Sequence, residues 1–86
     1  MRLNELKKGR KAEVASIDSD DAALNAKLRE VGFAEGDTVE MIEVGPVAGR
    51  PLCIRLNRTL IALRPEEAAA IGVSDPHTLD TESPAA

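Results

Sequence analysis

The sequence predicts a small, mainly β domain of about five short strands with one or two short helices. Three observations predict it: a helical run that ends at a glycine before a strand-like run, two later segments with strand-like patterns, and a short chain. A chain of 86 residues buries only about 60% of the surface that it exposes when unfolded. We therefore expect one domain with one modest core.

A short helix is predicted before Gly32. Leu24, Leu28 and Val31 follow the i, i+4, i+7 spacing that places three side chains on one helix face. The cluster Ser19-Asp20-Asp21 supplies capping side chains at the start, and Gly32 suits the left-handed position that ends a helix. We expect the three apolar side chains to be buried.

Strands are predicted on both sides of this helix. Residues 11–18 carry Ala12, Val14 and Ile17, and residues 38–44 follow a turn at Gly36-Asp37 and are rich in branched side chains. Both segments are short enough for a small sheet. They supply the first two of the expected strands.

The second half of the chain predicts a hairpin, a helical turn and a last strand. Residues 51–56 alternate Leu52, Ile54 and Leu56 with other residues, as in a strand with one buried face. After a turn at Asn57-Arg58, residues 59–63 are almost continuously apolar, which predicts burial on both sides. Pro65 then starts a helical turn over residues 66–71, and residues 72–73 form a short last strand.

Composition predicts an aliphatic domain over residues 1–73, followed by a polar, acidic C-terminal tail over residues 74–86. Hydrophobic residues make up 43% of the chain, yet Phe33 is its only aromatic residue. No apolar run approaches the roughly 18 residues of a membrane span, and the N-terminus lacks the apolar stretch of a signal peptide. We expect a cytoplasmic protein that does not insert into membranes, and the lone Cys53 agrees with a reducing compartment.

The low aromatic content argues against two functions of small β domains. Docking of proline-rich peptides needs an aromatic-lined groove, and binding of single strands needs rings on which bases stack. The chain has no Trp or Tyr. Its net charge of −4 also argues against a nucleic-acid partner, because phosphate neutralisation supplies most non-specific affinity.

The basic residues form two candidate patches. Of the 15 acidic residues, Asp75, Asp80 and Glu82 fall in the tail, which leaves 12 acids against 11 bases in the rest of the chain. One patch gathers around Lys7, Lys8, Arg10 and Lys11, and the other comprises Arg50, Arg55, Arg58 and Arg64. Either these are solvated charges that protect strand edges, or the arginines bind an acidic partner through paired hydrogen bonds to carboxylates.

The sequence does not predict an enzyme or a required cofactor. The only histidine, His77, lies in the polar tail, and no phosphate-binding glycine loop or pair of nucleophile and base can be assembled. Cys53 has only Arg55 as a basic neighbour in sequence, so we interpret it as a structural thiol.

No dedicated metal site is predicted. Asp18, Asp20 and Asp21 lie where a helix cap is expected, and capping is the better interpretation for that run. His77, with Asp75 or Asp80, makes a weak surface candidate for an adventitious divalent cation. The tail otherwise has the composition of a disordered segment with one apolar residue, Leu79, and a weak homodimer through it is a further hypothesis.

Four motifs follow one another along the chain: Leu3-x-x-Leu6-x-x-Gly9; Leu28-Arg29-Glu30-Val31-Gly32-Phe33-Ala34-Glu35-Gly36-Asp37; Gly45-Pro46-x-x-Gly49-x-Pro51; and Ile61-Ala62-Leu63-Arg64-x-x-Glu67-Ala68-x-x-Ile71-x-Val73. In their order and spacing they resemble the FeoA family of small SH3-like proteins linked to bacterial ferrous iron uptake. The resemblance spans residues 3–73, although the family usually has a proline where this chain has Ala34-Glu35.

The resemblance implies a small SH3-like β-barrel and an accessory protein that docks on FeoB, the GTP-hydrolysing ferrous iron permease, and modulates it. Arg50, Arg55, Arg58 and Arg64 are then the candidate partner-binding residues. Two alternatives remain open. One is a metal-responsive regulatory module related to the C-terminal SH3-like domain of DtxR-type repressors, and the other is a direct divalent-metal sensor.

Overall fold

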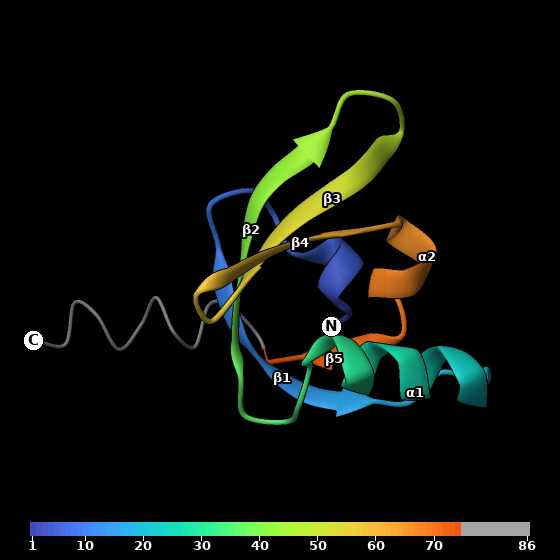
Figure 1. Ribbon diagram of the computed structural model, residues 1–86. Coiled ribbons are helices and arrows are strands. Elements are labelled where there is room, and N and C mark those ends of the chain that lie inside the picture. Colours follow the sequence, from blue (N-terminus) through green and yellow to red (C-terminus); the bar gives the residue numbers. More distant parts are fainter. Residues whose placement is uncertain (75–86) are drawn as a thin grey trace, which may run out of the picture.

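The computed structural model describes residues 1–74 of the chain. These residues form five strands, two short helices and one 3-10 turn (Figure 1). In chain order they are η1 (Leu3–Glu5), β1 (Lys11–Ile17), α1 (Ala22–Val31), β2 (Thr38–Gly45), β3 (Gly49–Leu56), β4 (Thr59–Leu63), α2 (Pro65–Ala68) and β5 (Ile71–Val73). The prediction of a mainly β domain with about five strands and one or two short helices is confirmed.

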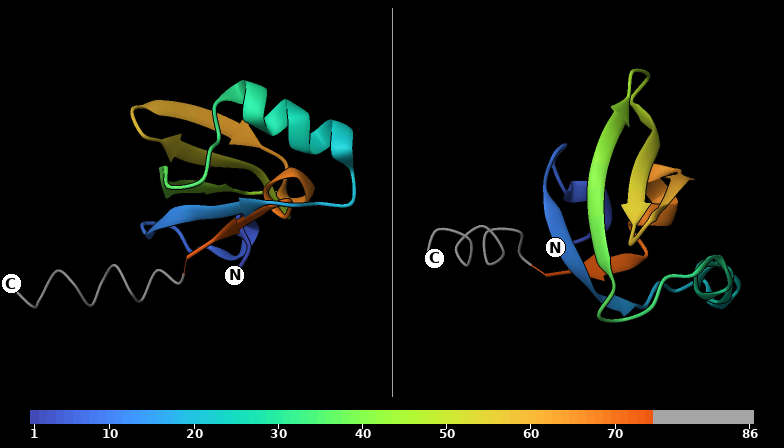
Figure 2. Two further views of the ribbon diagram at one scale, coloured as in Figure 1. Left: turned by 90° about the horizontal axis from the view of Figure 1, so that it is seen from below. Right: turned by 60° about the vertical axis from the view of Figure 1, so that its left-hand side comes forward.

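The five strands form one antiparallel sheet in the order β4-β3-β2-β1-β5. Figure 2 shows the sheet curled around a common interior, with the β3–β4 hairpin facing β1 and β5 across it. All buried side chains in residues 1–74 are apolar, and Phe33, Leu3, Leu28, Met41 and Ile54 are among the largest. As the composition predicted, aliphatic side chains supply nearly all of this core.

Helix α1 begins and ends as predicted, but only part of its predicted face is buried. The Asp21 carboxylate accepts hydrogen bonds from the backbone N–H groups of the first turn, and Gly32 ends the helix with a φ of 129°. Leu28 is buried and Leu24 packs against the core, whereas Val31 is 43% exposed. The prediction for Val31 is wrong because the chain reverses at Gly32 and the side chain of Phe33 enters the core instead.

Strand β1 buries three apolar residues although their spacing is not strictly alternate. Ala12 and Val14 are two residues apart, but Ile17 follows Val14 by three. The pairing of β1 with β5 shifts its register between Val14 and Ser16. This irregularity is a β-bulge, and the extra residue returns Ile17 to the buried face.

Strands β3 and β4 gave one correct prediction and one wrong one. Leu52, Ile54 and Leu56 are all buried, as their alternation predicted. In β4 the prediction of burial on both faces is wrong: Leu60 is 58% exposed and Ala62 is also exposed. Leu60 and Ala62 lie on the face of the sheet that points away from the barrel interior, where Arg55 of β3 is also exposed. The edge position of β4 leaves, in addition, one of its backbone edges unpaired in residues 1–74.

The last part of the described chain closes the barrel next to the N-terminus. Pro65 occupies the first turn of α2, as predicted, and β5 is buried along its length. The Val73 N–H donates a hydrogen bond to the Met1 carbonyl oxygen at 2.8 Å, and Arg2 pairs with Gly72. The N-terminal residues therefore cover the outer edge of β5, whereas β4 pairs only with β3 in residues 1–74.

Candidate functional site

Of the four predicted partner-binding arginines, Arg55 lies on the outer face of the sheet, over β2, β3 and β4. Glu40, Arg55 and Leu60 are direct neighbours across these three strands. The Arg55 Nη1 atom lies 3.3 Å from the Glu40 Oε1 atom, while Leu60 extends into solvent beside this pair. We call this set, together with the half-buried Cys53 and the exposed Ala62, the outer face.

Arg50 lies at the start of β3 and reaches to α2. Its guanidinium makes two hydrogen bonds to the Glu66 carboxylate, at 3.1 and 2.8 Å. The backbone N–H of Glu66 itself and then Arg50 lower the pKa of this carboxyl group. Both side chains are about half exposed, so water screens the pair and an incoming carboxylate could exchange with Glu66.

Arg58 and Arg64 differ from the other two arginines because, among residues 1–74, neither forms an ion pair within 4 Å. Arg58 is exposed in the β3–β4 turn, directly after Asn57, whose φ is 55°. Arg64 is exposed before α2, and its backbone N–H donates a hydrogen bond to Glu67 at 2.9 Å. Both guanidinium groups are available to a partner.

The four arginines do not form a single cluster. Arg50 and Arg58 lie near opposite ends of β3, and eight residues of extended strand span about 26 Å. Leu63 pairs with Leu52, so Arg64 lies toward the Arg50 end, while Arg55 lies between the two ends. A partner that contacts all four must cover the length of the β3–β4 hairpin.

The second basic patch is partly neutralised. The Lys8 Nζ atom lies 2.6 Å from the Glu43 Oε1 atom, and Lys11 pairs with Glu40 in the register of β1 and β2. Lys8 is therefore paired with a carboxylate, and Lys11 has a glutamate as its neighbour on the adjacent strand. In both patches, some cations are paired with a carboxylate among residues 1–74 and others are not.

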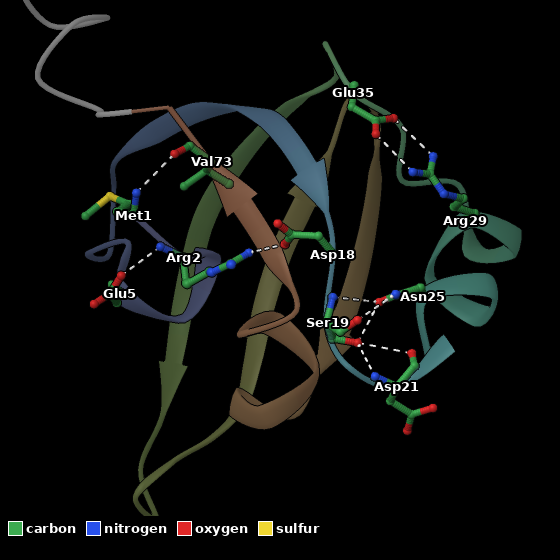
Figure 3. A network of polar contacts seen from close by, with 10 residues as sticks. All are labelled: Met1, Arg2, Glu5, Asp18, Ser19, Asp21, Asn25, Arg29, Glu35 and Val73. Atoms are coloured by element: carbon green, nitrogen blue, oxygen red, sulfur yellow. Dashed lines mark hydrogen bonds and ion pairs between the residues drawn. The ribbon is translucent and has the colours of Figure 1, made fainter. Parts of the chain in front are cut away.

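Two further arginines, Arg2 and Arg29, form ion pairs within the domain, as Figure 3 shows. Arg29 makes two hydrogen bonds to Glu35, at 3.0 and 2.9 Å, and lowers the pKa of the Glu35 carboxyl group to about 2. Arg2 pairs with Asp18 and lowers the pKa of that carboxyl group. Since Asp21 caps α1 and Asp18 has a cationic partner, the capping interpretation of this run is confirmed for Asp21.

The described part of the chain offers no ready metal centre. No group of three or more His, Cys, Asp or Glu side chains in residues 1–74 is arranged to hold a metal ion. The weak candidates His77, Asp75 and Asp80, and the proposed dimer contact through the tail, lie outside the described residues. No helix among residues 1–74 is long and apolar enough to cross a membrane.

Sequence reasoning missed Leu60 as a candidate contact residue. An apolar residue inside an apolar strand predicts a core position, and only the structure shows that Leu60 shares the outer face of the sheet with Arg55. The exposed Leu60 places an apolar contact beside Arg55, which makes the outer face amphipathic. Such a mixture of apolar and arginine side chains is typical of the contact surfaces of protein complexes.

Comparison with known proteins identifies the family to which the fold and the motifs point. The family model described as the FeoA domain matches residues 1–75. A search of curated protein sequences gives no match.

Solved structures support the same family assignment. One is the FeoA structure from Stenotrophomonas maltophilia in complex with zinc, which is described as a procaryotic SH3 domain protein and a possible ferrous iron transport activating factor. Its sequence is 39% identical to this chain, and the two structures match with a TM-score of 0.77 over 86% of this chain and 89% of that one. The FeoA protein from Chlorobium tepidum is 33% identical, with a TM-score of 0.75 over 85% of this chain and 68% of that one.

A manganese-dependent transcriptional repressor shares the fold. It is 19% identical, with a TM-score of 0.77 over 87% of this chain and 41% of the repressor. At this identity the likeness shows the fold alone. The described residues therefore form an SH3-like barrel of the kind found in both groups of proteins.

Proposed function

The chain belongs to the FeoA family, and we propose that it is a cytoplasmic accessory protein of bacterial ferrous iron uptake that docks on the permease FeoB and modulates it. Family membership supports a role in the ferrous iron transport system. Docking rather than catalysis is the proposed mode of action, so the protein acts as a binding module and requires no cofactor of its own.

The observation that carries the proposal is the amphipathic outer face on the β3–β4 hairpin. Arg55 lies directly across from the exposed Leu60, and Arg58 lies two residues before Leu60 in the adjoining turn. A guanidinium group binds a carboxylate through two parallel hydrogen bonds, and an apolar neighbour adds contact area when water leaves the interface. We propose that this surface contacts an acidic patch on the cytosolic GTPase part of the permease.

Calorimetry tests the proposal. The purified protein is titrated into the cytosolic GTPase part of the matching permease, with and without GTP and ferrous iron. We expect saturable binding that weakens about tenfold or more in the Arg55→Glu/Arg58→Glu variant and that then depends less on salt. Absence of binding under all conditions would contradict the proposed function.

The single variant Arg55→Glu has a matched control in Arg29→Glu. Each reverses one exposed cation and separates it from a carboxylate partner, Glu40 for Arg55 and Glu35 for Arg29. Arg29 lies on α1, away from the outer face. If Arg29→Glu weakens binding as much as Arg55→Glu does, the contact is not at the β3–β4 hairpin.

The second candidate is a metal-responsive module, which the zinc complex of the S. maltophilia protein favours. We propose that any divalent cation binds this chain weakly, through His77 with Asp75 or Asp80. Titration with Zn²⁺ and Fe²⁺ of the full chain and of its His77→Ala variant tests this. Tight binding of either metal that changes the affinity for the permease would make metal sensing the better description.

A further inference from the structure

Strand β4 leaves one row of backbone hydrogen-bonding groups without a partner in residues 1–74. The Asn57 N–H donates to the Thr38 carbonyl on β2 at 3.1 Å, so the peptide groups of Leu56, one residue earlier, face the opposite way, toward β4. The direction in which the peptide groups point alternates along a strand. The pairs that exchange hydrogen bonds between β3 and β4 are therefore Leu56–Thr59, Ile54–Ile61 and Leu52–Leu63. The N–H and C=O groups of Leu60 and Ala62 therefore point away from the sheet.

The edge of β4 differs from the other edge of the sheet. The N-terminal residues cover β5, where Val73 bonds to Met1 and Arg2 pairs with Gly72. Along β4 the described residues supply no such cover, and the sequence of the strand contains no proline, charge or bulge to discourage pairing. Two donors and two acceptors remain for an incoming strand.

The charged residues around β4 determine which kind of partner strand can pair with its free edge. Residues 57–65 contain two cations, Arg58 and Arg64, and no acid. Two copies of β4 paired antiparallel about Ile61 would place Arg58 of one copy opposite Arg64 of the other, at both ends of the ladder. Like charges placed directly opposite destabilise a strand pair, so self-association at this edge is opposed.

We propose that β4 extends its sheet by pairing with an acidic, extended segment of a partner protein. Antiparallel pairing places partner residues opposite Ala62 and Leu60, and each exchanges two hydrogen bonds with the edge. Their side chains lie on the outer face beside Leu60, so apolar residues fit there. Acids two residues further out on each side fall opposite Arg64 and Arg58, which gives the pattern acid-x-apolar-x-apolar-x-acid.

A designed peptide tests this inference without reference to any permease, so its failure and the failure of the proposed function are distinguishable. The probe is acetyl-Glu-Thr-Val-Ser-Ile-Thr-Glu-amide, titrated into the full chain while backbone amide signals are followed by NMR. We expect slower solvent exchange of the Leu60 and Ala62 amides on binding, because these N–H groups gain acceptors. The amides of Ile61 and Leu63 already face β3 and should change little.

Two control peptides separate the backbone and charge contributions. Replacing both terminal acids by lysine should weaken binding about tenfold or more at low salt, since two attractive charge contacts become repulsive. N-methylation of the two apolar residues removes two of the four hydrogen bonds to the edge and should abolish the protection. In the Arg58→Glu/Arg64→Glu variant the preference should reverse in favour of the lysine peptide.

Three results would overturn the inference. Equal affinity for the acidic and lysine peptides, or protection at amides outside β4, would exclude the proposed recognition. Protection of Leu60 and Ala62 before peptide addition would identify another occupant: a second copy if it grows with protein concentration, or the chain's own acidic tail if it disappears in the Asp75→Asn/Asp80→Asn/Glu82→Gln variant.

Discussion

Leu28 and Val31 offer a direct test of how α1 packs against the barrel. Both are aliphatic residues of the same helix and both fit the predicted apolar face, but Leu28 is 1% exposed and Val31 is 43% exposed. Leu28→Ala removes a fully buried side chain, and such substitutions cost about 2–5 kcal/mol because a cavity remains. Val31→Ala should change the free energy of unfolding by only about 0.5 kcal/mol, since alanine also favours the helix.

Circular dichroism during urea and thermal unfolding measures this difference, because the chain has no Trp or Tyr for fluorescence. For a domain of this size each kcal/mol shifts Tm by about 4–8 °C, so Leu28→Ala should lower Tm by roughly 10 °C or more. The urea m-value should stay constant in both variants. A loss for Val31→Ala as large as that for Leu28→Ala would refute the packing described for α1.

Two further predictions concern a glycine and a pair of charges. Gly45→Ala should destabilise the β2–β3 hairpin by about 1 kcal/mol or more, measured by urea unfolding, because a Cβ atom there would collide with the Arg50 carbonyl group. Arg29 and, after it, a backbone hydrogen bond lower the pKa of Glu35 from 4.5 to about 2, so the contribution of Glu35 to stability is present above pH 4.5 and disappears as the pH falls toward 2. In Arg29→Met the part of this acid dependence of Tm that comes from Arg29 should be lost, and an unchanged pH profile would contradict it.

The sequence predicted those parts of the fold that depend on local pattern. The alternation of Leu52, Ile54 and Leu56 identified a buried strand face, and Asp21 and Gly32 identified the ends of α1, because capping and turn preferences act over a few residues. These signals do not depend on which strands become neighbours. These signals can therefore be recognised in the sequence before the order of the strands in the sheet is known.

The errors arose where burial depends on tertiary pairing. Strand β4 is as apolar as a central strand, but Leu60 lies on the outer face of the barrel beside Arg55 and is exposed there. Val31 fits the helical period, yet Phe33 fills the core at the point where the chain turns. For the candidate site, the sequence supplied the four arginines, whereas their spread along the hairpin and the apolar neighbour Leu60 followed only from the register.

The two proposed contacts on the β3–β4 hairpin can be separated because they use different residues. Arg58 belongs to both, whereas Arg55 projects from the outer face and Arg64 follows the free edge of β4. If the permease docks by the side chains of the outer face, Arg55→Glu should weaken permease binding more than Arg64→Glu does. If the permease instead supplies the acidic strand that pairs with β4, Arg64→Glu should weaken binding at least as much, and the Leu60 and Ala62 amides should become protected in the complex.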